Sequence, residues 1–196
     1  MPISTHPMRI PGSWKEGYVL DYHTKSSDFV GYDEYGHPRF DTARTEVGEL
    51  LYRLKYKGER DALKELVGVS AAFIRGWGPP IHAIVPVPST RVRAVQPVLL
   101  LATGLVKELD VPLRDVVQRE QSPKQLKNVF DYHERIKLLE NVHNVTSTVL
   151  RGKSVLLVDD LYRSGATLTA VTEALRTKGK VSTVYAFAPT RTRSAS

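Results

Sequence analysis

Short apolar runs, each separated from the next by polar turns and helical patterns, most restrict how this chain folds. Residues 82–87 and 154–158 are runs of this kind, and residues 181–187 form a third. Runs of this length are typical of strands buried on both faces of a parallel sheet. Because helical patterns lie between them, the sequence predicts a doubly wound α/β sheet, in which ligands bind beyond the carboxyl ends of the strands.

Apolar residues at helical spacing predict the helices that cover this sheet. The helical patterns run over residues 43–56, 62–76, 98–105 and 168–175. Asp41 or Thr42 is the expected N-cap of the first helix. Residues 112–148 are less regular, with an expected strand start at Val116-Val117 and a helical stretch over residues 132–139. A long mobile loop is expected within them.

The N-terminal residues differ in composition from the rest of the chain. Residues 1–40 are rich in Gly, Pro, Tyr and Asp, with turn signals between short apolar pieces, and this predicts a hairpin or an irregular subdomain. The length of 196 residues fits one ordinary domain. We therefore expect an N-terminal extension over residues 1–44 and a core over residues 45–196.

Net charge and composition limit the classes of partner and site that this chain can have. The chain has 28 Lys and Arg against 21 Asp and Glu, a formal net charge of +7, so its surface should attract a phosphorylated metabolite or a nucleic acid. It has no cysteine, which excludes thiolate zinc sites and cysteine nucleophiles. Residues 1–14 lack the apolar centre of a secretory signal, and the apolar stretch 95–106 is too short to span a membrane. A cytoplasmic protein without a membrane partner is expected.

The segment from residue 155 to residue 168 carries the clearest chemistry. Asp159 and Asp160 stand where a buried strand ends, and small and polar residues follow at the start of a helix. The free N–H groups of a helix N-terminus favour a phosphate, to which Ser164 and Thr167 add hydroxyl donors. The two carboxylates accept hydrogen bonds from hydroxyl groups or from metal-bound water. A phosphate beside a diol describes a ribose 5-phosphate.

This segment resembles the PRPP-binding signature of type I phosphoribosyltransferases, which is an apolar strand, two acids and a Thr- or Ser-Gly-x-Thr loop. The resemblance implies a type I phosphoribosyltransferase-like doubly wound parallel sheet with a small N-terminal hood over the acceptor pocket. It implies that Asp159 and Asp160 hold the ribose hydroxyls and, largely through water, Mg²⁺. The loop that would hold the 5-phosphate consists of Arg163, Ser164, Gly165, Ala166 and Thr167.

Further segments resemble the ComF competence-protein branch of that superfamily, and the likeness spans about residues 47–190. They include residues 54–58 and 85–89, Arg119 and Gln125-Leu126. The resemblance implies that the turn after the first core strand binds pyrophosphate. The residues of that turn are Pro88, Ser89, Thr90, Arg91 and Arg93.

Residues 113–135 match the flexible loop that closes over the site in the superfamily and excludes water. Arg119 and Lys124 are its predicted catalytic contacts to departing pyrophosphate, and Lys127 and Arg135 are further candidates. The ComF pattern places an Arg and an Asn soon after the Gln, whereas Arg135 and Asn141 come later here.

Two departures bear on the reaction. ComF proteins usually carry an N-terminal four-cysteine zinc ribbon, and here residues 1–44 replace it without a cysteine. In hypoxanthine-type purine salvage enzymes an Asp three places after the second acid is the general base, and that place is Arg163 in this chain. An arginine there suits an acidic acceptor, or an acceptor that needs no proton removed.

The sequence therefore predicts PRPP-dependent, Mg²⁺-assisted transfer of a phosphoribosyl group to a small-molecule acceptor, with release of pyrophosphate. Two alternatives stay open. One is a ComF-like accessory that binds single-stranded nucleic acid, as the net charge also suggests. The other is a sensor that binds PRPP or a nucleotide without catalysis. The acceptor and self-association into a homo-oligomer are not decided by the residues.

Overall fold

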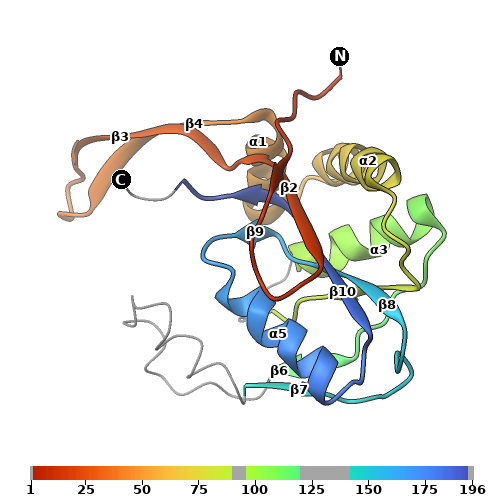
Figure 1. The fold of residues 1–196 in the computed structure, drawn as a ribbon. Coiled ribbons are helices and arrows are strands. Elements are labelled where there is room, and N and C mark those ends of the chain that lie inside the picture. Colours follow the sequence, from red (N-terminus) through yellow and green to blue (C-terminus); the bar gives the residue numbers. More distant parts are fainter. Residues whose placement is uncertain (1, 90–95, 120–141, 194–196) are drawn as a thin grey trace.

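A computed structural model describes residues 2–89, 96–119 and 142–193 of the chain. Six of the described strands form one central sheet, which runs through the middle of the molecule (Figure 1). Its order is β1-β2-β10-β8-β5, with β9 paired to β10. The strands are β1 (Met8–Arg9), β2 (Glu16–Tyr22), β5 (Ala83–Pro86), β8 (Ser154–Val158), β9 (Leu161–Tyr162) and β10 (Thr183–Arg191). All neighbouring pairs are parallel except β1 and β2.

Helices cover both faces of this sheet, which confirms the predicted doubly wound α/β fold. The described helices are α1 (Glu46–Tyr52), the π-helix η1 (Arg53–Lys57), α2 (Arg60–Trp77), α3 (Pro97–Leu109) and α5 (Ala166–Thr177). Residues of α1, α2 and α3 share one apolar core with the sheet, and residues of α5 share the other. In the part of the chain that the structure describes, no helix is long and apolar enough to cross a membrane.

The alternation of side chains along a strand explains why a single short strand contributes to the apolar cores on both faces of the sheet. Successive side chains of a strand point to opposite faces. In β8, Val155 and Leu157 pack in the core on the α5 side, whereas Leu156 and Val158 pack on the side of the other helices. All four side chains are fully buried. A run of uninterrupted apolar residues is therefore required here, as the sequence predicted.

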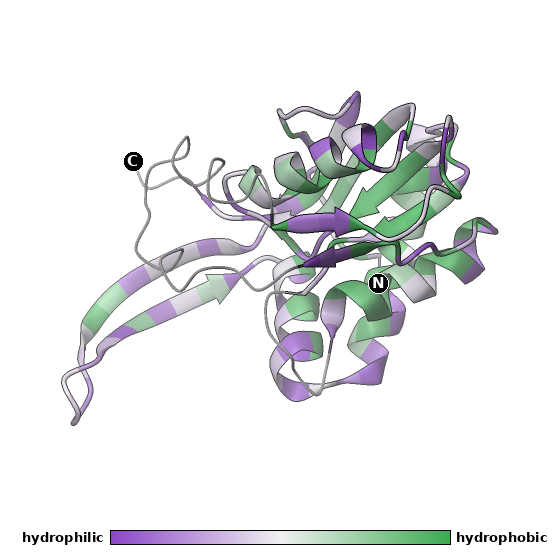
Figure 2. Ribbon diagram, turned by 90° about the horizontal axis from the view of Figure 1, so that it is seen from below, coloured by the Kyte–Doolittle hydropathy of each residue, from purple (hydrophilic) through white to green (hydrophobic). Residues whose placement is uncertain are grey.

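Two smaller antiparallel ladders lie beside the central sheet. The strands β3 (Thr24–Tyr32) and β4 (Pro38–Arg44) form a hairpin that projects from the body (Figure 1). The strands β6 (Val117–Arg119) and β7 (His143–Val145) pair below α5. Hydropathy separates these parts, because the central strands are largely hydrophobic whereas the hairpin mixes both kinds of residue (Figure 2).

The N-terminal residues divide between the sheet and the hairpin. Residues 8–22 supply β1 and β2, and Val19 and Leu20 are fully buried there. This part of the predicted extension belongs to the central sheet, because β2 pairs with β10 along most of its length. The expected hairpin is formed by residues 24–44 alone. A domain boundary at residue 44 would therefore separate β1 and β2 from the other strands of the central sheet.

The first helix begins later than the sequence predicted. Asp41 and Thr42 lie in β4, and Thr45 is the N-cap of α1, where its Oγ1 accepts a hydrogen bond from the Gly48 N–H at 3.0 Å. The Thr45 hydroxyl also donates to the Tyr22 carbonyl at 2.6 Å, which ties the helix start to the end of β2. This tertiary bond decides between N-caps that are similar in local preference. The helical stretch predicted over residues 132–139 lies outside the described residues.

Candidate functional site

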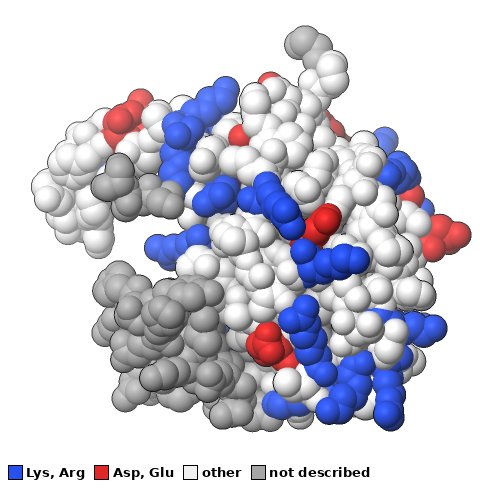
Figure 3. Space-filling view, viewed as in Figure 1, with Lys and Arg blue, Asp and Glu red and all other residues white. Residues whose placement is uncertain are grey.

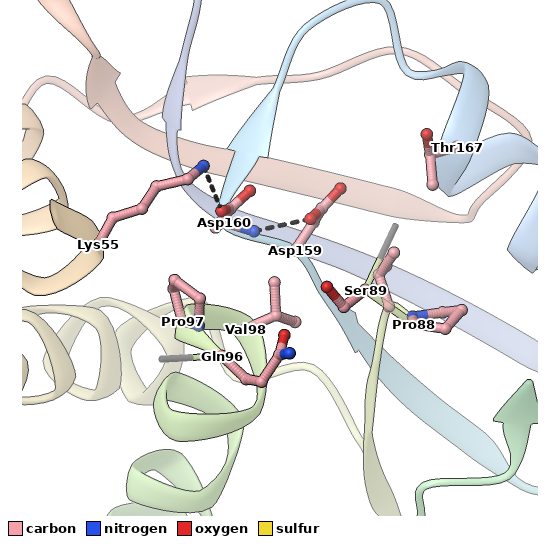
Figure 4. A pocket seen from close by; sticks show the side chains of 10 residues that line it. Lys55, Pro88, Ser89, Gln96, Pro97, Val98, Asp159, Asp160 and Thr167 are labelled. Atoms are coloured by element: carbon pink, nitrogen blue, oxygen red, sulfur yellow. Dashed lines mark hydrogen bonds and ion pairs between the residues drawn. The ribbon is translucent and has the colours of Figure 1, made fainter. Parts of the chain in front are cut away.

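Two neighbouring parallel strands deliver the predicted site residues to one edge of the sheet. β5 pairs with β8 in parallel, so the turn after Pro86 and the acids after Val158 emerge side by side. A cavity opens between them and the start of α3 (Figure 4). It is lined by Lys55, Val87, Pro88, Ser89, Gln96, Pro97, Val98, Asp159, Asp160 and Thr167. The structure therefore brings the acid pair, one end of the phosphate loop and part of the predicted pyrophosphate turn together.

The two carboxylates stand in unequal environments. The Asp159 N–H donates to the Phe187 carbonyl at 3.0 Å, and Asp159 Oδ1 accepts the Asp160 N–H at 2.8 Å. Burial, and next the negative charge of Asp160, raise the pKa of Asp159 to about 7. Each of these causes disfavours a second negative charge at this place. A bound cation or a pair of hydroxyl donors would relieve that penalty.

Lys55 is a site residue to which the sequence reasoning gave no role. Its Nζ lies 2.8 Å from Asp160 Oδ2, and both side chains are only 18% exposed. It reaches the acids from η1, a π-helix between α1 and α2. Such widened turns occur often at functional sites, because they redirect a side chain out of the regular helical path. The likeness of residues 54–58 to ComF proteins was the available signal, but no pattern in the residues predicts a π-helix.

The predicted 5-phosphate loop follows β9 and leads into α5, at the carboxyl end of the strands. Gly165 adopts the left-handed conformation, with φ of 79°, and is the N-cap of α5 without a side-chain cap. The Ala166 N–H donates to Ser164 Oγ at 3.5 Å, and because the N-cap offers no side-chain partner, the first turn of α5 still presents N–H groups to an anion. Arg163 and Ser164 are exposed beside them. A hollow follows this loop from Asp159 to Leu168.

Tyr162 fixes the loop to the N-terminal part of the chain. Its hydroxyl donates to the Pro11 carbonyl at 3.2 Å, and its ring meets Trp14 edge to face, with 6.4 Å between the centroids. A Cβ added to Gly165 would lie only 3.0 Å from this ring. The glycine thus provides both the conformation and the close approach that the loop needs.

The predicted pyrophosphate turn and mobile loop are described in part. Pro88 and Ser89 line the cavity, while Thr90, Arg91 and Arg93 lie outside the described residues. Arg119 stands at the end of β6 and borders a neighbouring hollow with Ser89, Gln96 and Asp115. The other candidates of the loop also lie outside the described residues: Lys124, Lys127, Arg135 and Asn141.

Guanidinium groups and tyrosine rings gather where the hairpin joins the sheet, next to Lys55. The Arg44 guanidinium lies 3.7 Å from the Tyr52 ring centroid, and Arg193 lies 4.5 Å from that of Tyr22. Arg191 lies near Tyr22 as well, at 5.7 Å. The buried Nε atoms of Arg44 and Arg191 have no hydrogen-bond partner in the described part of the chain. Sequence reasoning missed this cluster, because its members come from β2, β4, α1 and the end of β10.

The pKa of His23 is affected by the positive charge of this cluster. Burial first, and then the charges of Arg44 and Lys55, lower the pKa of His23. The imidazole is therefore neutral at physiological pH. Its Nδ1 lies 3.4 Å from Thr190 Oγ1, at the border between the sheet and the hairpin. The region beside the acid pair is thus positive without a contribution from this histidine.

The residues present fit a magnesium ion that arrives with a phosphorylated substrate. Mg²⁺ is usually held by one or two carboxylates together with waters and substrate phosphates. Burial, and next the adjacent Asp160 carboxylate, raise the pKa of Asp159, and a cation bound beside the two acids would offset both causes. No group of three His, Asp or Glu side chains arranged for a metal exists among the described residues, and such a shared site requires none.

Comparison with known proteins gives a family likeness and a related fold. The family model for the phosphoribosyl transferase domain matches residues 99–191. Adenine phosphoribosyltransferase from Trypanosoma brucei, solved with AMP, pyrophosphate and ribose-5-phosphate, has the same fold, with a TM-score of 0.50 and 14% identity over 93% of this chain and 73% of that one. Adenine phosphoribosyltransferase from Saccharomyces cerevisiae gives a TM-score of 0.46 and 14% identity, over 82% of this chain and 81% of that one. Over residues 99–191 the chain is therefore similar to the phosphoribosyl transferase domain, and its fold is that of type I phosphoribosyltransferases.

Within that superfamily the similarity is to ComF proteins. Competence protein ComFC of Bacillus subtilis (strain 168) is 29% identical over 140 residues, which cover 71% of this chain. The match spans 57% of the length of ComFC. The predicted resemblance to this superfamily and to its ComF branch is thereby confirmed.

Proposed function

We propose that this protein binds PRPP and transfers its phosphoribosyl group to an acidic small molecule, with release of pyrophosphate, in the cytoplasm. The observation that carries the proposal is the Asp159-Asp160 pair, held by Lys55 between the loop of residues 163–167 and the turn at Ser89. That arrangement offers hydroxyl acceptors, an anion cradle and a second polar turn within one cavity.

Each part of the site has a task in this reaction. The N–H groups at the start of α5 would bind the 5-phosphate, and the acids would accept hydrogen bonds from the ribose hydroxyls. Lys55 holds Asp160 in place through their ion pair while the substrate enters. Mg²⁺, held by Asp159 and Asp160 largely through water, would neutralise charge on the pyrophosphate. The protein contributes mainly positioning and electrostatic stabilisation.

The transfer itself exchanges one bond at C1 of the ribose. The bond between C1 and the pyrophosphate oxygen breaks, and the pyrophosphate leaves with the electron pair. The acceptor nucleophile then forms its bond to C1. Arg119 and Lys124 would contact the departing group, and Ser89 and the arginines of its turn would hold it. This assignment rests on their place in the sequence and on the position of Ser89 and Arg119 beside the cavity.

The surroundings of the site favour an acidic acceptor. No carboxylate stands at position 163 to remove a proton, and Arg163 occupies that place. Arg44, Arg191 and Arg193 add positive charge beside Lys55. An acceptor that is already an anion needs no base and gains from these charges.

Calorimetric titration of PRPP with Mg²⁺ tests the proposal. We expect the wild-type protein to bind and the Asp159→Asn/Asp160→Asn variant to lose binding. Pyrophosphate release with a panel of acidic acceptors then distinguishes an enzyme from a sensor. PRPP binding without release for any acceptor would favour the sensor, and no binding by the wild type would contradict the phosphoribosyl site.

Binding of single-stranded nucleic acid is the second candidate. The net charge of +7 favours it, and Lys and Arg side chains outnumber acids on the face shown in Figure 3. It predicts binding of a single-stranded oligonucleotide that weakens steeply with salt. Competition separates the two candidates, because PRPP should displace an oligonucleotide only where both use the same site.

A further inference from the structure

The projecting hairpin carries an exposed aromatic cluster that the proposed reaction does not use. Phe29 is 53% exposed, Tyr32 69% and Phe40 55%. The rings contact each other, with centroids 5.2 Å apart for Phe29 and Tyr32 and 5.8 Å apart for Phe29 and Phe40. A contiguous apolar patch of this kind on a soluble domain marks an interaction surface more often than chance.

The hairpin has little support of its own. No residue of β3 or β4 is buried, and an isolated two-stranded ladder is marginally stable in water. Asp28 and Asp41 lie directly opposite each other next to the aromatic pair, and like charges in that position are destabilising. A partner surface that covers the rings and neutralises the acids would remove both penalties.

Charge indicates what kind of surface that is. Residues 28–41 contain four carboxylates, Asp28, Asp33, Glu34 and Asp41, against one guanidinium, Arg39, so this outer part carries −3. Because the whole chain carries +7, the remainder carries +10. In Figure 3 the blue side chains spread over the body, while the outer hairpin, at the left, shows red and white. Opposite net charges therefore lie on the outer hairpin and on the rest of the same molecule.

We propose that the hairpin of one copy docks through Phe29, Tyr32 and Phe40 on the basic body of a second copy, which returns its own hairpin in the same way. Reciprocal docking closes a two-fold dimer with two identical contacts. The acids around the rings disfavour a nucleic acid as the occupant, since its phosphates would be repelled. They equally disfavour pairing of two hairpins with each other.

Sedimentation velocity over a wide range of protein concentration tests the proposal. The wild type should be a dimer whose dissociation constant rises with salt. Phe29→Ser/Phe40→Ser should raise that constant at least about tenfold, because aromatic anchors dominate interface energies. Val149→Ser is the matched control, since Val149 is 56% exposed and lies outside the hairpin, and it should leave the constant unchanged. Far-UV circular dichroism should show that all variants keep the fold, because none of these side chains is buried.

A second variant distinguishes the docking mode. Asp28→Asn/Asp41→Asn should weaken the dimer if the hairpin meets a basic body, but strengthen it if two acidic hairpins pair. A strengthened dimer would therefore overturn the proposal, as would a wild type that stays monomeric at every concentration. A monomer that loses oligonucleotide binding in the phenylalanine variant would assign the hairpin to nucleic acid instead. None of these readouts depends on PRPP.

Discussion

Lys55 and Asp160 are 105 residues apart in the chain, yet their side chains form an ion pair with 2.8 Å between Nζ and Oδ2. The pair joins the π-helix η1 to the end of β8. It gives one of two adjacent carboxylates a direct ion-pair partner, whereas Asp159 feels the Lys55 charge only from a distance. The geometry of the candidate site therefore depends on a helix that lies outside the two strand-and-turn segments in which the motifs were predicted.

Lys55→Met should weaken PRPP binding about tenfold or more, because it removes a charge from the anion site and frees Asp160 to rotate. Both side chains are 18% exposed, so loss of the partner should also lower the free energy of unfolding by roughly 1–2 kcal/mol, between the values for exposed and for buried ion pairs. Calorimetry and urea unfolding measure the two effects. Lys57→Met is the control, since Lys57 is exposed at the end of the same helix. Equal PRPP affinities for the two variants would contradict a role for the ion pair.

The raised pKa of Asp159 predicts a pH dependence of stability. With a pKa of about 7 in the folded state against an ordinary value of 3.8, the native state binds more protons than the unfolded state between these pH values. Stability should therefore fall as pH rises through this window. Asp159→Asn removes the effect, so its free energy of unfolding relative to wild type should rise by more than about 1 kcal/mol between pH 4.5 and pH 8.

Urea unfolding at the two pH values measures this difference. Asp61→Asn, in the first turn of α2, is the control and should shift stability equally at both. If the free energy of unfolding of Asp159→Asn relative to wild type were the same at both pH values, the Asp159 carboxyl would be ionised in the folded protein throughout this range, and the prediction would be wrong.

The sequence predicted the fold where periodicity has a single physical meaning. Runs such as residues 154–158 can only be fully buried strands or buried helices, and the turn residues that follow decided for strands. The acid pair was found for the same reason, because two carboxylates and a glycine at a strand end have few alternative uses. Both predictions depend on residues that are neighbours in the chain.

Features that depend on tertiary contacts could not be predicted in this way. The N-cap of α1 is Thr45 because its hydroxyl reaches the Tyr22 carbonyl, and local preference does not distinguish it from Thr42. Residues 16–22 join the central sheet because β10 offers them a partner, although their own pattern resembled an irregular segment. Lys55 and Arg191 reach the site only through the packing of distant elements.

Gly165→Ala should disturb the phosphate loop specifically. The new Cβ would be strained at a φ of 79° and would lie 3.0 Å from the Tyr162 ring. We expect a loss of about 1–3 kcal/mol in stability and a larger loss in PRPP affinity than any other single glycine change. Gly152→Ala is a close control, because Gly152 has a φ of 70° with open space around it and lies away from the cavity. That variant should lose some stability and keep PRPP binding, and equal losses of binding would contradict a role for the loop.

Gly48→Ala should be the most damaging glycine substitution for the fold. Gly48 lies in α1, and an added Cβ would be 2.0 Å from the His23 carbonyl oxygen, which is backbone and cannot move aside. The helix would have to shift away from the end of β2, where Thr45 anchors it. Gly68→Ala, in α2, meets nothing within 4 Å and should instead stabilise the protein by about 0.5–1 kcal/mol through helix propensity. Thermal unfolding of the two variants should therefore shift in opposite directions, and a mild effect of Gly48→Ala would show that α1 does not pack closely on His23.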